Sequence, residues 1–331
     1  MLLPVRDARE TLDECLASLA AQTLVEHEVI AVDDGSRDGS LERLREAARA
    51  DPRVRVLPGP ARGLVEALND ALAHARAPLV ARMDADDVSH PDRLLRQVRR
   101  LVAEAALTAL GSCVRLVGTP GTGNDGMRAY VEWQNRLLEP DQIARELYVE
   151  SPLVHPSVTM RTDALRALGA YRETGGPEDY DLWLRGAAAG WRFAKLADTL
   201  LDWRDGARRL TRTDPRYHAD RFRAAKLDAL GAGLLADRRP VVVWGAGPIG
   251  KAWSRELQAR GLRVAAFVEV DPDKLGQRIH GAPVVGVADV PLLERGGLHL
   301  GAVGNADARE RIRAEAARLG LAEGRDFVAV A

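Results

Sequence analysis

Cysteine is almost absent from this chain of 331 residues, which contains only Cys15 and Cys113. Two cysteines cannot build a disulfide framework, and their spacing suits no metal site. We therefore expect a reducing compartment. Lysine is scarce as well, because only four of the 47 basic residues are lysines. We attribute this scarcity to genome or growth-temperature bias, since the arginines alternate with acidic residues along helical stretches.

Long apolar runs are also missing. None approaches the roughly 18–20 residues that a membrane span needs, and the first residues lack the basic-then-apolar layout of a signal peptide. The formal net charge is −1, so no overall positive charge attracts nucleic acid or anionic lipid. With 46% hydrophobic and 29% charged residues, the chain can bury cores of ordinary size. These counts favour a soluble, cytoplasmic protein with no transmembrane segment and no nucleic-acid partner.

The length suits two domains. In the first hundred residues short apolar runs alternate with amphipathic helical stretches, as is typical of an α/β fold with a doubly wound, mainly parallel sheet. A charged, proline-terminated stretch at 236–240 precedes a second such alternation. We predict domains at 1–236 and 237–331. The predicted strands are 2–5, 29–32, 54–57, 79–83, 157–160 and 192–203, and the predicted helices are 10–21, 41–50, 64–75, 91–102, 127–138, 162–168, 178–189 and 214–235.

Acidic clusters follow two of the predicted strands, namely Asp33-Asp34-Gly35-Ser36 and Asp84-Ala85-Asp86-Asp87. Ligands bind at the carboxyl ends of the strands in parallel sheets. Asp34 can accept the imide or amino hydrogens of a nucleotide base there, or the segment is a tight turn with Asp38 or Ser40 as a helix N-cap.

An Asp-x-Asp pair can hold a divalent cation on a nucleoside diphosphate, since hard oxygen ligands suit magnesium or manganese. With 28 aspartates, chance alone accounts for the three pairs that occur, Asp84/Asp86, Asp179/Asp181 and Asp271/Asp273. Only the first follows a predicted central strand. There the carboxylates repel one another unless a cation or hydrogen-bond donors offset the charge. The alternative is a solvated turn with capping aspartates.

Glu178 and Asp179 begin a predicted helix after the loop 173–177. The helix dipole favours the ionised form of a carboxyl group at this place, and an ionised carboxylate there can act as a general base. The alternative interpretation is a plain acidic first turn.

These clusters, in this order, resemble family 2 glycosyltransferases. The resemblance rests on Pro4-Val5-Arg6-Asp7, the Asp33-Asp34 and Asp84–Asp87 segments with Pro91 beyond them, and Glu178-Asp179 before Trp183. It covers residues 1–235. It implies the GT-A fold and an inverting, metal-dependent transfer from a nucleotide-diphosphate sugar.

The resemblance also implies roles for individual residues. Asp34 would recognise the base, Asp86 would bind Mn²⁺ or Mg²⁺, and Asp179 would be the catalytic base. The remaining implied positions are Pro4, Val5 and Arg6 at the edge of the base pocket, Asp84 and Ala85 near the ribose, Arg62 and Asn69 beside the nucleotide, and Asp87, His155 and Glu178 in the sugar or acceptor region. His155 is equally compatible with a structural role.

The segment 208–214 suits a flexible lid whose arginines, Arg212 among them, reach the diphosphate, or else a solvated loop. Two features depart from the family pattern. Arg6 stands where members usually carry an aromatic residue, and the Gln-x-x-Arg-Trp motif of processive synthases is missing. The second departure argues for a transferase that adds a single sugar.

In the C-terminal part, Gly245-x-Gly247-x-x-Gly250 stands between a predicted strand at 241–244 and a helix, and Glu269 follows a predicted strand at 264–268. The pattern predicts a small Rossmann-like α/β unit. This part resembles the N-terminal domain of bacterial sugar acyltransferases. A second nucleotide ligand at Gly245, Gly247, Gly250 and Glu269 is one hypothesis, and a structural or homo-oligomerising role is the other.

Together the patterns predict a glycosyltransferase that moves a sugar, from UDP-sugar in the first instance, to a hydroxyl acceptor in polysaccharide or glycolipid synthesis. Its partners would be the nucleotide-sugar donor and a sugar or lipid-linked acceptor, in the cytoplasm or peripherally at the inner membrane face. The alternatives are an NAD-dependent oxidoreductase that uses the C-terminal unit, which is short for that task, and a non-catalytic sugar-nucleotide sensor.

Overall fold

The computed structural model describes residues 1–59, 61–118, 125–206, 210–293 and 295–331. Arg208 and Arg209 of the predicted lid therefore lie outside the described residues. The chain divides into two compact units. The first comprises Met1–Ile143 and Pro152–His218, and the second comprises Ala144–Ser151 and Ala219–Ala331. Along the chain this division falls 18 residues before the predicted boundary at 236/237, and it assigns an internal segment to the second unit.

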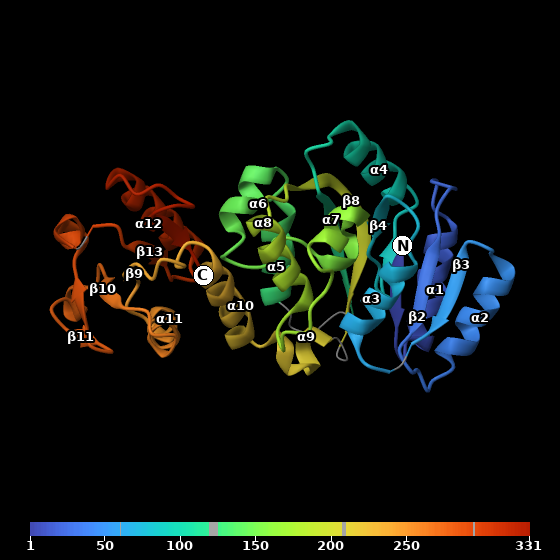
Figure 1. The fold of residues 1–331 in the computed structure, drawn as a ribbon, viewed down its shortest axis with the longest axis horizontal. Coiled ribbons are helices and arrows are strands. Elements are labelled where there is room, and N and C mark those ends of the chain that lie inside the picture. Colours follow the sequence, from blue (N-terminus) through green and yellow to red (C-terminus); the bar gives the residue numbers. More distant parts are fainter. Residues whose placement is uncertain (60, 119–124, 207–209, 294) are drawn as a thin grey trace. The chain divides into compact units, whose positions relative to one another are not determined.

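The first unit begins with a parallel three-stranded sheet in the order β1-β2-β3. Its strands β1 (Leu2–Val5) and β2 (Val29–Asp33) are fully buried, and β3 (Val54–Pro58) is partly exposed. Helices α1 (Arg9–Ala20), α2 (Ser40–Ala50) and α3 (Leu64–His74) connect the strands. Figure 1 shows α2 and α3 on opposite sides of this sheet. The predicted strand–helix alternation of this part is confirmed.

The second sheet of this unit has the order β4-β7-β6-β8-β5. Strand β4 (Leu79–Ala81) continues beside β1, because Leu2 and Arg82 form a parallel bridge and the Met83 amide donates to the Leu2 carbonyl at 3.1 Å. The other strands are β5 (Val88–Ser89), β6 (Ala109–Gly118), β7 (Thr159–Arg161) and β8 (Phe193–Asp205). Only β6 and β8 are parallel neighbours in this sheet. The fold is thus the expected α/β class with parallel-rich sheets, and its second half is mixed.

The remaining helices of the first unit cover this sheet or lead to it. They are α4 (Arg93–Ala103), α5 (Asp125–Asn135), α6 (Pro140–Glu146, whose last residues belong to the second unit), η1 (His155–Ser157), α7 (Thr162–Ala167), α8 (Glu178–Ala188), α9 (Leu210–Thr213) and η2 (Pro215–Tyr217). The predicted continuous helix 214–235 is wrong at its start. His218 has extended backbone angles, so η2 ends there and α10 (Ala219–Ala232) begins separately.

The second unit contains a six-stranded sheet in the order β11-β12-β10-β9-β13-β14, in which all neighbours except β11 and β12 are parallel. The strands are β9 (Val241–Trp244), β10 (Val264–Val268), β11 (Arg278–Ile279), β12 (Ala282–Val285), β13 (Leu298–Gly301) and β14 (Phe327–Ala329). Helices α11 (Pro248–Ala259) and α12 (Ala306–Arg318) lie on opposite sides of β9 and β13 (Figure 1). The short helices η3 (Pro272–Lys274) and η4 (Val287–Leu292) complete the unit.

Apolar contacts place α10 in the second unit. Leu227, Leu230 and Leu235 are buried in one core with Trp253 and Phe267. A chain cut at the predicted boundary would leave the apolar face of α10 without its core.

An ion-pair cluster ties the internal segment 144–151 to the same unit. The buried Arg313 guanidinium on α12 lies 2.5 Å from the Glu146 carboxylate and also contacts Glu310 and Glu323. Lys226 of α10 donates to the Val149 carbonyl at 2.7 Å. The segment therefore serves the second unit although it lies far from α12 in the sequence.

Among the described residues, no helix combines the length and the apolar character that crossing a membrane requires.

Replacing Arg313 by methionine should leave Glu146 buried without its close cationic partner. Breaking a buried ion pair from one side costs about 3–5 kcal/mol, so the urea-unfolding curve, followed by circular dichroism, should shift to lower denaturant. Arg318→Met is the matched control, because Arg318 lies on the same helix and pairs with Glu315 while 66% of its side chain is exposed. Equal shifts for the two variants would contradict the assignment.

Candidate functional site

Asp34 lies directly after β2 and is almost fully buried. Its Oδ2 accepts hydrogen bonds from the Arg6 guanidinium at 3.3 Å and from the Gly63 amide at 3.0 Å. Its Oδ1 is buried and has no partner among the described residues. Gly63 has a φ of +105°, a backbone conformation that favours glycine, so the loop before α3 can fold onto the carboxylate. The arrangement leaves one carboxylate oxygen of Asp34 as an available acceptor.

The other residues expected around the base lie on the same sheet edge. The Val5 carbonyl accepts from the Asp34 amide at 2.8 Å, and Pro4 is paired with Val32 on the next strand. Arg62 extends to the surface beside Glu66 and Asp70.

Asn69 has a different environment from Arg62. Its side-chain amide both donates to and accepts from the backbone of Tyr171, at 3.0 and 3.1 Å. This pairing favours a role for Asn69 in placing Tyr171, and its contact with a nucleotide stays a prediction.

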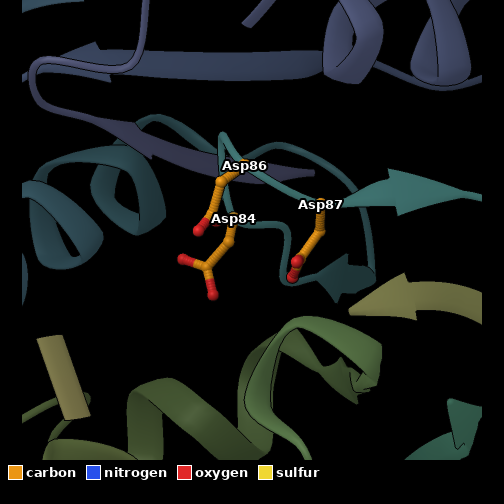
Figure 2. Close-up of side chains that lie close together, drawn as sticks. All are labelled: Asp84, Asp86 and Asp87. Carbon is orange, nitrogen blue, oxygen red and sulfur yellow. The ribbon is translucent and has the colours of Figure 1, made fainter. Parts of the chain in front are cut away.

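Three carboxylates gather on the loop after β4. One ligand oxygen from each of Asp84, Asp86 and Asp87 lies within 4.8 Å of the others, and Figure 2 shows the three side chains close together on this loop. We call them the acidic cluster. Carboxylate oxygens at this spacing are the hard donors that Mg²⁺ and Mn²⁺ prefer. The donor set therefore fits a divalent cation.

Arg204 of β8 holds the loop of the acidic cluster. Its Nε donates to the Asp86 carbonyl at 2.7 Å, and its backbone amide donates to Asp87 Oδ1 at 2.8 Å. The Ala85 carbonyl accepts from the Thr11 hydroxyl at 3.0 Å. The loop is thus fixed from β8 and from α1, and Ala85 serves the scaffold through its backbone.

Two buried arginines that the sequence analysis did not identify stand next to this loop. Arg82 Nη2 donates to Asp84 Oδ1 at 2.6 Å. Arg93 donates to the Arg82 carbonyl at 2.6 Å and to the Pro156 carbonyl at 2.8 Å, and burial lowers its pKa to about 10. An arginine inside the apolar run 79–83 was the available signal for Arg82, because buried arginines need partners.

Glu178 and Asp179 begin α8, as predicted from the sequence. Glu178 is buried, and its Oε2 accepts from the Tyr217 hydroxyl at 2.7 Å. His155 Nδ1 lies 3.6 Å from Glu178 Oε1, and His155 Nε2 shares a hydrogen bond with the Tyr171 hydroxyl at 3.0 Å. Neither tyrosine was identified from the sequence, because both act through contacts across long stretches of chain.

The two adjacent acids titrate in opposite directions. Burial and the negative charge of Glu178 raise the pKa of Asp179. Burial alone would raise the pKa of Glu178, but its interactions with His155 and Tyr217 hold that pKa below the ordinary value. Burial and the charge of Arg82 lower the pKa of His155. Two interacting carboxyl groups with separated pKa values are the pattern of an acid–base site.

Arg212 of α9 donates to Asp205 Oδ2 at 2.7 Å, at the end of β8. Its predicted reach to a diphosphate stays a prediction.

The loop 245–250 of the second unit has two positions at which the backbone requires glycine. A Cβ on Gly250 would lie 1.9 Å from the Gly245 carbonyl oxygen, and Gly245 has a φ of +103°. Gly247 is the N-cap of α11. However, Glu269 Oε2 accepts from the Ala246 amide at 3.0 Å, and its Oε1 accepts from the Val270 amide at 2.8 Å. Glu269, which is predicted to bind a ribose hydroxyl, thus accepts hydrogen bonds from backbone amides of its own surroundings. The binding of a second nucleotide stays a prediction.

Comparison with known proteins places the first part of the chain. A family profile described as "Glycosyl transferase family 2" matches residues 1–169. The chain is 31% identical over 203 residues to the amylovoran biosynthesis glycosyltransferase AmsE of Erwinia amylovora. This match covers 61% of the present chain and 73% of AmsE. It is 27% identical over 209 residues to the O-antigen biosynthesis glycosyltransferase WbnJ of Escherichia coli, covering 62% and 78%.

Among solved structures, the chain resembles the mannosyltransferase PcManGT of Pyrobaculum calidifontis, in complex with GDP-Man and Mn²⁺. The TM-score is 0.51 and the identity is 20%, over 78% of this chain and 77% of that one. At this identity the similarity shows the fold, which is of the GT-A type.

Asp86→Asn should weaken Mn²⁺ binding at least tenfold, because a cation held by few carboxylates loses a charged ligand. Calorimetric titration with MnCl₂ alone measures the effect. Asp273→Asn is the control, since Asp273 belongs to an Asp-x-Asp pair in the second unit. Unchanged affinity in the Asp86 variant would exclude the acidic cluster as the cation site.

Proposed function

Because the chain belongs to glycosyl transferase family 2 and is a glycosyltransferase, we propose that it transfers a sugar from a nucleoside diphosphate sugar to an acceptor hydroxyl with inversion. The observation that carries the mechanism is the pair Glu178 and Asp179 at the start of α8, whose pKa values are driven apart. UDP-sugar is the first candidate donor. A single sugar is added in each reaction.

Asp34 recognises the base of the donor. Its unpartnered Oδ1 accepts an imide or ring N–H, while Arg6 and Gly63 hold Oδ2. Burial makes this acceptor selective, because an unmade hydrogen bond to a buried carboxylate is costly. Pro4 and Val5 form the adjacent edge, and Arg62 lies at the solvent side.

Asp84, Asp86 and Asp87 would hold Mn²⁺ or Mg²⁺. When bound, the cation offsets the negative charge of the departing nucleoside diphosphate. The loop that carries these residues is held by Arg204 and Thr11, so the ligand positions are largely set before the donor arrives.

Asp179 takes the proton of the acceptor hydroxyl as the hydroxyl oxygen attacks the anomeric carbon. The bond between that carbon and the β-phosphate oxygen breaks on the opposite face, and the electron pair leaves with the nucleoside diphosphate. A raised pKa makes Asp179 a stronger base than a solvated carboxylate. Glu178, held by Tyr217 and His155, maintains the negative charge that produces this effect.

The acceptor belongs to polysaccharide or glycolipid assembly. The support is the family together with the names of AmsE and WbnJ, which refer to the biosynthesis of amylovoran and of O-antigen. Such an acceptor is consistent with action in the cytoplasm or at the inner membrane face. The second unit is proposed as a homo-oligomerising or ligand-binding module.

Asp179→Asn preserves the size of the side chain but cannot accept the proton. We expect turnover to fall by roughly 10²–10⁴-fold, while donor affinity stays within a few-fold. The measurement is release of nucleoside diphosphate from the donor with water as acceptor, beside calorimetric titration with UDP. Asp181→Asn is the control on the same helix, because Asp181 is paired with Arg185. Near-normal turnover in the Asp179 variant would refute the base.

A thermal-shift panel should identify the donor. UDP, GDP and their sugars are tested with Mn²⁺ and with Mg²⁺, and a ligand at a hundredfold excess over its dissociation constant stabilises the folded state by about 2.7 kcal/mol. The true donor should raise the melting temperature most, and Asp34→Asn should reduce that rise. If no nucleotide shifts the melting temperature with either cation, the donor class is wrong.

A further inference from the structure

A tyrosine from a distant part of the chain contacts the first turn of helix α8. Tyr217 ends η2 and is half-buried. Its hydroxyl donates a hydrogen bond to Glu178 Oε2 at 2.7 Å, across 39 positions of sequence. Such a length is typical of a hydroxyl that donates to an ionised carboxylate. Burial and the charge of Glu178 raise the pKa of the Tyr217 phenol, so the hydroxyl keeps the proton that it donates.

The first turn of α8 needs support from outside the helix. Pro177 is its N-cap residue, and a proline side chain has no oxygen atom with which to cap the free amides of a helix start. Further along the helix, Tyr180 and Trp183 are fully buried and fix its position. The turn that carries Glu178 and Asp179 therefore depends on side-chain contacts from other segments.

Tyr217 is the closer of two side chains that face the Glu178 carboxylate. The other is His155, whose Nδ1 lies 3.6 Å from Glu178 Oε1. That distance exceeds the usual length of an N–H···O hydrogen bond. The hydroxyl of Tyr217 therefore makes the stronger of the two contacts.

The residue before Tyr217 connects η2 to the loop that precedes α8. The Arg216 guanidinium lies 3.5 Å from the Glu173 carboxylate and 3.0 Å from that of Asp214. Glu173 is the first residue of the loop 173–177. Tyr217 is thus placed opposite Glu178 by a second contact between the same two segments.

The two acids of this turn differ in accessibility. Glu178 is buried, whereas Asp179 is half-buried. An acceptor hydroxyl can therefore reach Asp179, while the carboxylate of Glu178 faces groups of the protein itself. A buried carboxylate with its own hydroxyl donor is suited to fixing the turn rather than to contacting the acceptor.

We propose that Tyr217 is a positioning residue for the transfer reaction: its hydroxyl fixes the Glu178 carboxylate, and through it the first turn of α8, so that Asp179 meets the acceptor hydroxyl in one orientation. This inference rests on the proposed function of Asp179 as the base. A small misplacement of a reacting group is enough to lower a rate substantially.

The test is Tyr217→Phe, which removes only the hydroxyl oxygen. Turnover is measured as release of nucleoside diphosphate from the nucleotide sugar that the thermal panel selects, with water as acceptor and saturating Mn²⁺. We expect kcat to fall about tenfold, since hydrogen bonds to charged groups are stronger than neutral ones. The KM of the donor should stay within a few-fold, because the proposed donor contacts lie on other segments. Tyr148→Phe is the matched control, since it removes the hydroxyl of a half-buried tyrosine in the second unit.

A second measurement needs no donor. Amide hydrogen exchange, followed by mass spectrometry, reports local opening of a helix end. In Tyr217→Phe the peptide that covers 177–185 should exchange several-fold faster than in the unmodified protein, and in Tyr148→Phe it should exchange at the normal rate. Unchanged exchange of this peptide in Tyr217→Phe would overturn the inference.

Glu178→Gln tests whether Tyr217 acts through Glu178. The glutamine keeps an acceptor for the hydroxyl but carries no charge, so adding Tyr217→Phe to Glu178→Gln should lower kcat by at most about twofold more. A further tenfold loss in the double variant would show that Tyr217 acts by another route, and it would overturn the inference.

An unchanged kcat in folded Tyr217→Phe would also overturn the inference. So would a loss of donor affinity alone, which would make Tyr217 an anchor of the segment 210–217. If Tyr217→Phe does not fold, Glu178→Gln decides, since normal turnover in that variant would show that the fixed carboxylate is not needed. Asp179→Asn separates the two proposals. If that variant remains active the base assignment fails, whereas an inactive Asp179→Asn with normal turnover in Tyr217→Phe refutes only the role of Tyr217.

Discussion

Mutual repulsion between carboxylates is the constraint on which the first unit depends. Acidic side chains stand at the ends of β2 and β4 and at the start of α8, and each of them is buried or half-buried. The chain offsets their charge locally, with the Arg6 guanidinium at Asp34, backbone amides at Asp33, and the Tyr217 hydroxyl at Glu178. Such fixed donors do not need to reorganise when charge develops in a reaction, and this is how preorganised sites stabilise transition states. The loop that carries the acidic cluster follows β4, which pairs with β7 and continues beside β1.

Much of the fold could be predicted from the sequence because the strands of parallel sheets are short apolar runs separated by amphipathic helices. The prediction missed β6, which contains few β-branched residues and carries Gly111 in its first half. A glycine in a strand suggests a break, but here it allows the close approach of Lys195, whose Cγ would lie 3.0 Å from a Cβ on Gly111. The direction in which β8 pairs with β6 was equally hidden, since sequence periodicity does not reveal which strands are neighbours.

Some residues of the candidate site could likewise be predicted from the sequence, and others could not. Residues that follow a strand directly, such as Asp34 and Asp86, could be proposed because parallel strands end at one edge of the sheet. Tyr171 and Tyr217 could not, because each reaches its partner over a distance in sequence that no local pattern records. The extent of the second unit depends on contacts of the same kind. The pairing of Arg313 with Glu146 joins residues 167 positions apart, and neither is unusual in its local sequence.

The discontinuous second unit has a consequence for the order of synthesis. Residues 144–151 leave the ribosome well before α10, and long before the strand at Phe327–Ala329 that completes the sheet. Domains fold largely in the order in which they are made. Here the nascent first unit carries an internal segment in which Glu146 lacks its cationic partner until α12 has been translated. If only the C-terminal third were exchanged with that of a relative, residues 144–151 would come from one protein and the rest of the second unit from the other. An exchange that preserves the contacts within the second unit therefore includes both pieces.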